Sequence, residues 1–418
     1  MNTAKTTAVQ RWQLVAGVYA SCALFMLFQG GKTSFMLFMI LNVLLAYLVL
    51  GRWSGISRIT GERRLIHGGS KELTLAAGTR LEVELNMRIP GVWPIPYVLV
   101  RERLLRKGGK DMPFEVSFVP DIKRNGFVSY LTPPLQRGYY QFAPTVCSTR
   151  DIFGLFEHDG RFEAEQSFSV LPQTVNIRHW HQLHRGMKGP YSHSVSPRSA
   201  KETTQINGVR EYLYGDRLSR IHWNATAKTG EWKSKEFERE AMPRLLLILD
   251  RETKGYPKPE QFELAVSVTA SLAEFGLRRE TAMGLVSIGK TPDVFATRSA
   301  PQQRNVIMNH LVGVESDGSL PIYGVIQQAS PLLAPGSIAV IISPRLGEET
   351  VKTMQWLDRK GLMPCLVHIA STIREEDYGT WQRLIRSRAW PIYSIRHLQE
   401  LPAALEGGSL NGTVEPVV

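Results

Sequence analysis

The side chains best able to do chemistry lie between Arg210 and Glu240, in the stretch REYLYGDRLSRIHWNATAKTGEWKSKEFERE. As an enzyme site, this stretch offers Asp216 as a base and His222 as a proton carrier. It contains no evident nucleophile or electrophile that would complete a reaction. We therefore expect no catalytic residues and no enzyme activity.

The same stretch could instead bind nucleic acid, because its basic residues can contact phosphates and its aromatic rings can stack on bases. Acidic residues interrupt that positive charge throughout: Glu211, Asp216, Glu231, Glu236, Glu238 and Glu240. This dilution disfavours a nucleic-acid clamp.

A structural and partner-docking role is the favoured interpretation. Tyr212, Trp223 and Trp232 are amphipathic side chains that favour a buried body and a hydrogen-bonded tip. Gly215 permits a tight turn. We predict that Arg–carboxylate pairs and buried tryptophans join two folded parts of the chain here and form a docking surface. The other residues assigned to this surface are Arg210, Asp216, Arg220, Lys235 and Glu236.

A second candidate site follows the continuous apolar run RLLLILD, which ends at Asp250. Such a run is typical of a strand buried on both faces. Ser343 ends the similar run SIAVIIS. Ligands of parallel sheets bind at the carboxyl ends of the strands, so Asp250 and Ser343 lie where a ligand would be expected.

Composition limits the possible partners. The chain of 418 residues predicts two or three domains. Its 50 Lys and Arg outnumber 38 Asp and Glu, and the net charge of +12 fits anionic lipid, nucleic acid or simply a basic membrane protein. The membrane protein is favoured. Three scattered cysteines (Cys22, Cys147, Cys365) indicate a reducing compartment.

Two apolar runs near the N-terminus predict a transmembrane hairpin. They are WQLVAGVYASCALFMLF (12–28) and SFMLFMILNVLLAYLVL (34–50), each close to the minimum length for crossing a bilayer. Lys32 is the one charge between them, whereas Lys5, Arg11, Arg52, Arg58, Arg63 and Arg64 flank the pair. The positive-inside rule then places both termini, and the bulk of the chain, in the cytoplasm.

The rest of the chain changes its pattern once. Up to about Pro172, short alternating runs such as TRLEVELNMRI predict an antiparallel β-sandwich of the immunoglobulin-like type. The following segment, with its cluster His179, His181 and His184, is predicted to be a solvated linker, since that spacing suits no standard zinc site. From Arg244, strands alternate with helices, which predicts a doubly wound parallel sheet.

The first strand ending in Asp250 resembles that of a von Willebrand factor A domain. The stretch GVREYLYGDRLSRIHWNATAKTGEWKSKEFERE, together with RGYYQFAPTVCSTRDIFGLF (137–156), resembles the signature of the bacterial domain of unknown function 58 family. This gives five expected regions: a transmembrane hairpin (1–52), a β-sandwich (53–176), a linker with the signature (177–243), a von Willebrand factor A-like domain (244–400) and a tail (401–418).

The von Willebrand resemblance raises the question of a metal, because binding members hold Mg²⁺ with D-x-S-x-S. Here Glu252 and Lys254 replace both serines, and an ammonium group would compete with the cation. We expect a degenerate site without metal or other cofactor, in which Asp250 pairs with Lys254 or Arg251, or caps a backbone group.

The family resemblance also implies partners, a MoxR-type AAA+ ATPase and often a membrane transglutaminase-like protein. The expectation is a multi-pass cell-membrane protein acting as a non-catalytic scaffold or adaptor in cell-envelope protein assembly. It has no evident small-molecule substrate and no nucleic-acid partner. Two alternatives stay open: metal-dependent ligand binding through the A-type domain, and nucleic-acid binding at the membrane.

Overall fold

The computed structural model describes residues 2–66, 74–152, 154, 156–180, 183, 200–241, 244–279, 281–299, 301–329, 333–370 and 378–407. Within these residues the chain divides into two compact units, Met1–Val170 and Leu171–Val418. Each unit is described separately below.

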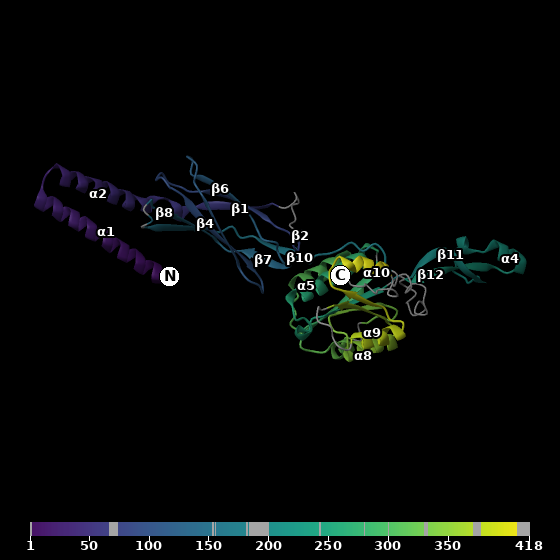
Figure 1. Ribbon diagram of the computed structural model, residues 1–418. Coiled ribbons are helices and arrows are strands. Elements are labelled where there is room, and N and C mark those ends of the chain that lie inside the picture. The colour runs from purple at the N-terminus through teal and green to yellow at the C-terminus, as the bar shows by residue number, and fades with distance from the viewer. Residues whose placement is uncertain are drawn as a thin grey trace. The chain divides into compact units, whose positions relative to one another are not determined.

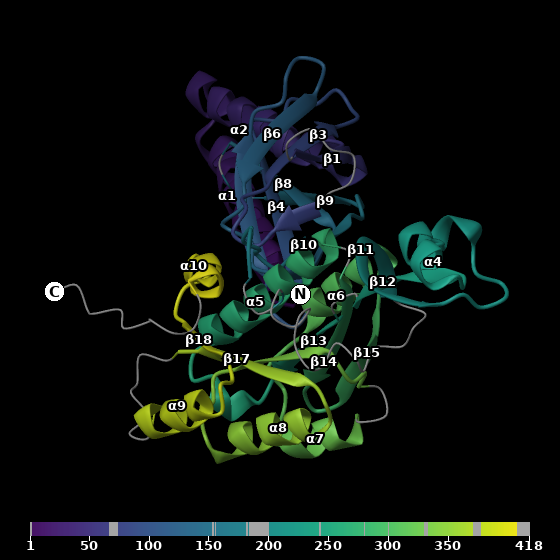
Figure 2. The ribbon, with the colours of Figure 1, turned by 90° about the vertical axis from the view of Figure 1, so that its right-hand side faces the viewer.

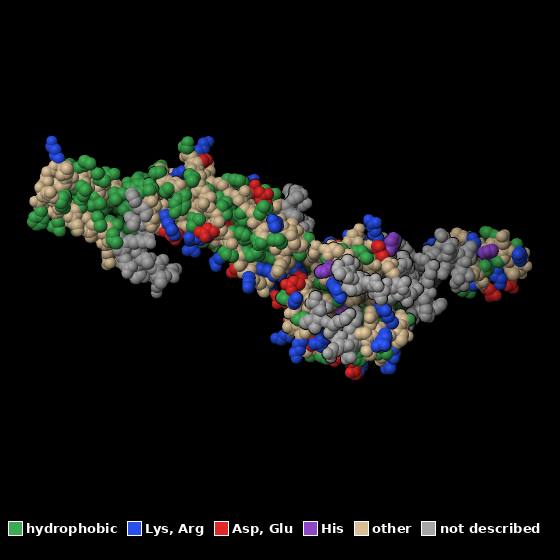
Figure 3. Space-filling view, viewed as in Figure 1, with side chains coloured by type: hydrophobic (Ala, Val, Ile, Leu, Met, Phe, Trp, Pro, Cys, Tyr) green, Lys and Arg blue, Asp and Glu red, His purple; other side chains and the backbone are tan. Residues whose placement is uncertain are grey.

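Two helices begin the first unit, α1 (Asn2–Gln29) and α2 (Lys32–Leu50) (Figure 1). Both are long and apolar enough to cross a membrane, over Trp12–Gln29 and Lys32–Leu50. Hydrophobic side chains are spread over the surface of this helical part in Figure 3. The helices contact each other through a hydrogen bond of 3.2 Å from the Tyr19 hydroxyl to Asn42 Oδ1.

Two antiparallel sheets follow, as the alternating runs predicted. The smaller sheet has the strand order β1-β3-β6, and the larger has the order β2-β10-β7-β4-β8-β9 with β5 paired to β4. The strands are β1 (Thr60–Ile66), β2 (Thr74–Ala76), β3 (Glu82–Arg88), β4 (Val98–Arg106), β5 (Met112–Phe118), β6 (Asn125–Leu131), β7 (Gly138–Phe142), β8 (Thr145–Arg150), β9 (Glu157–Phe162) and β10 (Ser167–Leu171).

The two sheets share a core, because every second side chain of each strand faces the other sheet. Leu85 and Val128 of the small sheet pack with Val100 and Cys147 of the large one. A charged pair lies within the same interior, between Arg63 of β1 and Glu102 of β4.

The second unit is built on a six-stranded sheet of order β15-β14-β13-β16-β17-β18. All neighbours are parallel except the edge strand β15, which is antiparallel to β14. The strands are β13 (Arg244–Asp250), β14 (Ala282–Ile288), β15 (Pro292–Arg298), β16 (Ile338–Ser343), β17 (Met363–Ile369) and β18 (Ile392–Ile395).

Helices cover both faces of this sheet (Figure 2). On one face lie α5 (Pro259–Arg278), α6 (Pro301–Gly313) and α10 (Glu400–Glu406); on the other lie α7 (Ile322–Gln328), α8 (Glu348–Arg359) and α9 (Tyr378–Ser387). Leu247 of the central strand packs toward the first layer and Ile248 toward the second. The doubly wound arrangement that strand–helix alternation predicted is therefore present.

The unit's borders differ from those expected. The segment from Leu171 to Trp180, partly assigned to a solvated linker, packs on this unit: Trp180 is fully buried and donates a hydrogen bond from Nε1 to the Tyr393 hydroxyl at 3.3 Å. Leu401 and Leu405 of α10 are also fully buried, so the core extends into the expected tail. His179 is exposed, and His181 and His184 lie outside the described residues, as does 408–418.

Between these segments the chain forms a two-stranded hairpin, β11 (Ala200–Glu211) and β12 (Lys233–Ala241). Its end carries a 3-10 turn (Leu218–Arg220) and the short helix α4 (Trp223–Thr229). This end, residues 208–235, is called the hairpin tip below. It contains most of the sequence signature.

Candidate functional site

The carboxyl end of β13 is occupied by the molecule's own groups. Asp250 Oδ1 accepts a hydrogen bond from the Glu252 backbone N–H at 2.9 Å, and Oδ2 accepts one from the Ser343 hydroxyl at 2.7 Å. The Tyr256 hydroxyl donates to the Asp250 carbonyl at 2.7 Å. Asp250 is completely buried, and this burial raises its pKa to about 6. Of the predicted arrangements, the capped backbone group is the one observed.

The other two positions of the degenerate metal loop face different surroundings. Glu252 forms an ion pair with Arg345 at 2.7 Å, whereas Lys254 is exposed. Among the residues that the structure describes, no group of three or more His, Cys, Asp and Glu side chains is arranged to hold a metal ion. The absence of a metal in solution stays a prediction.

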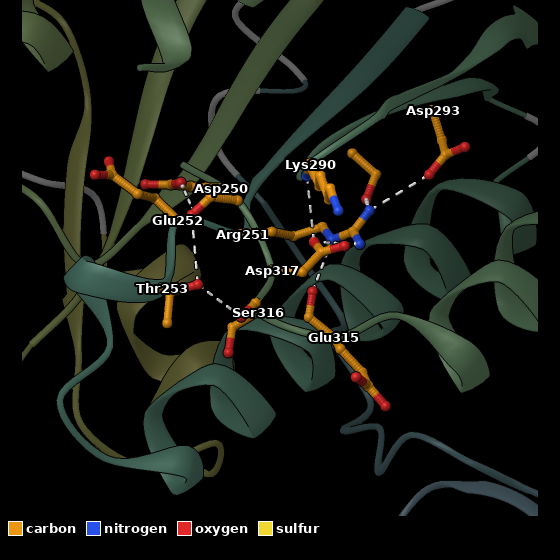
Figure 4. Close-up of polar contacts among 11 residues, drawn as sticks. Asp250, Arg251, Glu252, Thr253, Lys290, Asp293, Glu315, Ser316 and Asp317 are labelled. Carbon is orange, nitrogen blue, oxygen red and sulfur yellow. Dashed lines mark hydrogen bonds and ion pairs between the residues drawn. The ribbon is translucent and has the colours of Figure 1, made fainter. Parts of the chain in front are cut away.

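Arg251, which sequence reasoning considered only as a partner for Asp250, organises the neighbouring loops (Figure 4). Its Nη2 pairs with Asp317 at 2.6 Å and its Nη1 with Asp293 at 3.4 Å, and its Nε donates to the Glu315 carbonyl at 2.9 Å. The guanidinium thus ties the loop after β13 to the start of β15 and to the loop after α6. No signal in the sequence pointed to Asp293 and Asp317.

His368 near the end of β17 completes this buried polar edge. Its Nε2 lies 3.0 Å from the Pro344 carbonyl and its Nδ1 3.2 Å from the Ser394 hydroxyl. Because a carbonyl only accepts, Nε2 carries the proton and Nδ1 accepts from Ser394. Burial lowers the pKa of His368 to about 4, so the ring is neutral at physiological pH.

The hairpin tip is held by a local network around Asp216. Its Oδ1 pairs with Arg210 Nη2 at 2.7 Å, and its Oδ2 accepts from the Leu213 N–H at 3.1 Å. The Tyr212 hydroxyl donates to the Asp216 carbonyl at 3.0 Å. The bond from Arg210 lowers the pKa of Asp216, so the carboxylate stays ionised. Gly215, with φ of 107°, makes the predicted tight turn.

The tryptophans of the tip are not buried, contrary to the prediction. Trp223 is 65% exposed and Trp232 53% exposed. Trp232 contacts Trp223 and Tyr212, with ring centroids 6.5 Å and 5.6 Å apart. A two-stranded hairpin has no second layer in which to bury such rings. Further apolar side chains are exposed beside them: Leu213, Tyr214 and Leu218.

The remaining predicted residues are spread along the hairpin. Arg220 is half-buried, and its positive charge helps to lower the pKa of Asp216. Lys235 pairs with Val209 in the strand register, and Glu236 pairs with Gly208, although the Glu236 side chain lies outside what the structure describes. His222 accepts a hydrogen bond from the Ala225 N–H through Nδ1, which caps α4. This ring, which was considered as a proton carrier only for the disfavoured enzyme site, therefore has a structural role.

The comparisons with known proteins concern both parts of this site. Residues 208–362 match the family model DUF58, described as a protein of unknown function. An uncharacterized protein of Bacillus subtilis (strain 168), YeaD, is 28% identical over 340 residues, which cover 77% of this chain and 79% of that protein. The resemblance drawn from the signature is confirmed.

Solved structures give partial likenesses. Proximal thread matrix protein 1 from the mussel byssus is 12% identical with a TM-score of 0.30, over 40% of this chain and less than half (46%) of that one. The CARDB domain of a Pyrococcus furiosus protein is 18% identical with a TM-score of 0.18, over 27% and 87% of the two chains. These scores support no inference about function.

Proposed function

Since residues 208–362 match the DUF58 family model, we propose that the protein is a membrane-anchored, non-enzymatic adaptor that docks a protein partner through the hairpin tip. The observation that carries this proposal is the exposed aromatic and aliphatic surface of the tip. Tryptophan and tyrosine are enriched among the residues that dominate binding energies at protein interfaces. The Arg210–Asp216 pair stabilises the loop that presents them, which lowers the entropy lost on binding.

The partner proposed is a MoxR-type AAA+ ATPase, with a membrane transglutaminase-like protein as a further component, as the family resemblance implies. The membrane anchor is the α1–α2 pair, with the bulk of the chain in the cytoplasm. The second unit is taken to be a von Willebrand factor A-like domain. The metal-dependent alternative would require Asp250 to release Ser343 and Glu252, and nucleic-acid binding would have to overcome the acidic residues interleaved in the tip.

The test is a binding measurement with the full chain in lipid nanodiscs and the purified ATPase. Trp223→Ala combined with Trp232→Ala should raise the Kd at least about thirtyfold, which corresponds to ~2 kcal/mol. Leu384→Ala on α9, another exposed apolar residue of the same unit, is the matched control and should leave the Kd unchanged.

A second variant distinguishes the loss of a contact with the partner from unfolding of the tip. Leu218→Ser removes a side chain that is 66% exposed and whose loss leaves the three-ring cluster intact. Protection of the Leu213 amide from hydrogen exchange reports whether the Asp216 network persists. Unchanged affinity in both variants, with the protected amide retained, would refute docking through the tip.

A further inference from the structure

Three loops of the first unit leave the β-sandwich at the end where the apolar helices arrive. The register pairs Arg88, the last residue of β3, with Thr60 and Asn125, the first residues of β1 and β6. Val98 similarly pairs with Phe118. Leu99 pairs with Ser148, which places the end of β8 beside the start of β4. The loops 89–97 and 119–124, and the described residues 151, 152, 154 and 156 between β8 and β9, therefore lie at one end of the strands.

Aromatic contacts fix this end against the helices. Tyr47 of α2 contacts Trp93 of the first loop, with ring centroids 5.8 Å apart. Trp12 of α1 contacts Phe156 of the third loop at 4.6 Å. Trp12 and Tyr47 lie near the ends of the two candidate spans, where interfacial aromatics concentrate in membrane proteins.

The outermost side chains of these loops are apolar. Ile122 and Val92 are fully exposed (103% and 98%), and Val119, Ile152 and Trp53, the last of these just after α2, are each more than 70% exposed. The opposite end of the same strands differs, because the loop between β4 and β5 there reads KGGKD (107–111) and is exposed and charged. Single exposed apolar residues are ordinary, but five gathered around one end mark an interaction surface.

One arginine holds the loops in place. Arg124 adopts φ of 64°, unusual for a residue with a side chain. Its Nη1 donates to the Trp93 carbonyl at 2.6 Å, its Nε to the Ile89 carbonyl at 3.1 Å, and its Nη2 to the Ser54 carbonyl. Gly55 packs so closely that a Cβ would lie 1.7 Å from the Pro90 carbonyl oxygen. The apolar tips are therefore presented by a cross-linked framework.

We propose that Trp53, Val92, Val119, Ile122 and Ile152 form a lipid-contacting collar that inserts into the headgroup region around the base of the α1–α2 pair. The occupant is the bilayer surface, because the collar is continuous with helices apolar enough to span it. Exposed Arg58 and Lys123 beside the tips favour anionic headgroups. This inference depends on the proposed membrane anchor. The collar would hold the orientation of the β-sandwich at the bilayer through several contacts, in addition to the single connection after α2.

The experiment uses the full chain in nanodiscs that contain phosphatidylglycerol and lipids brominated along the acyl chain. Ile122→Cys and Val92→Cys each carry a bimane fluorophore, which brominated lipid quenches on contact. Leu131→Cys, 62% exposed at the opposite end of β6, is the matched control. Leu37→Cys in α2 reports on the anchor itself. Cys22, Cys147 and Cys365 are buried, so the wild-type chain supplies the labelling background.

The expected result is at least about twofold quenching at positions 37, 92 and 122 and none at 131, because the collar side chains should reach the lipid. Quenching at 37 without quenching at 92 and 122 would overturn the collar while the anchor stands. No quenching at 37 would refute the anchor. Iodide in the aqueous phase also quenches bimane. If the bimane at position 122 were protected from iodide but not quenched by brominated lipid, the residue would contact protein, and the collar would likewise be overturned.

Discussion

At the scale of single residues, two buried titratable groups beside the candidate ligand edge have pKa values shifted in opposite directions. Burial raises the pKa of Asp250 from 3.8 to about 6, and it lowers the pKa of His368 from 6.5 to about 4. In each case the folded state favours the neutral form.

These shifts predict opposite contributions to stability in the same pH window. Asp250 contributes stability that is fully present below pH 3.8. This stability is lost as the pH rises through about 6. His368 contributes stability above pH 6.5 that is lost as pH falls through about 4. At ~1.4 kcal/mol per pKa unit, each contribution is about 3 kcal/mol, so the two largely cancel in the wild type.

Substitution should separate the two contributions. Relative to the wild type, Asp250→Asn should gain stability as pH rises from 4 to 6, and His368→Gln should lose it. Urea unfolding of the detergent-solubilised chain at a series of pH values measures these differences in stability. Footprinting of peptides from β13 and β17 reports the unfolding of the second unit separately from that of the first. Parallel pH profiles for the wild type and Asp250→Asn would contradict a buried, neutral-favouring carboxyl.

At the scale of elements, the two sheets of the first unit are joined by a charged pair that no pattern in the sequence reveals. Arg63 Nη2 lies 2.5 Å from Glu102 Oε1, and both side chains are 1% exposed. Tyr130 and Thr145 donate to the same carboxylate, and Arg63 also stacks on the Phe142 ring at 4.0 Å. Sequence reasoning counted Arg63 only as a basic residue flanking the second span.

Removing the charge of Glu102 should therefore destabilise the sandwich strongly. Glu102→Gln leaves Arg63 buried without its counter-charge, at a cost of about 3 kcal/mol or more. Glu115→Gln removes one charge of the exposed Arg101–Glu115 pair, which joins β4 to β5, and should cost less than ~1 kcal/mol. Footprinting of β4 during urea unfolding compares the two. Equal midpoints would show that the buried pair contributes no more than a surface pair.

The elements also show how far periodicity carries. The continuous apolar runs predicted β13 and β16 because those strands are buried on both faces. Strand β15 was missed, since this partly exposed edge strand begins with proline and carries polar residues. Helix α6 was missed because PQQRNVIMNHLVG interleaves polar residues with apolar ones. Trp180 was predicted to lie in a solvated linker and is buried, whereas the tryptophans of the hairpin tip were predicted to be buried and are exposed. The residue type alone does not reveal whether a second layer of structure covers an aromatic side chain.

At the scale of the whole molecule, the proposed adaptor depends on which side of the membrane each unit occupies. The positive residues that set orientation act during insertion, before the domains fold. Arg63 therefore counts as a flanking charge at that stage, although it is later buried against Glu102. Lys32 is the one charge in the short connection between the helices. The excess of basic residues on the flanks predicts that this connection lies outside and both termini inside.

Cysteine accessibility in intact cells checks this orientation. Lys32→Cys should react with a membrane-impermeant maleimide added outside, because the connection between α1 and α2 is predicted to face that side. Lys107→Cys, exposed at the far end of β4 and β5, should react only after the cells are lysed. The native thiols are buried and should contribute little signal. Labelling of Lys107→Cys in intact cells would reverse the orientation, and it would place the hairpin tip out of reach of any cytoplasmic ATPase, so the adaptor proposal would fail with it.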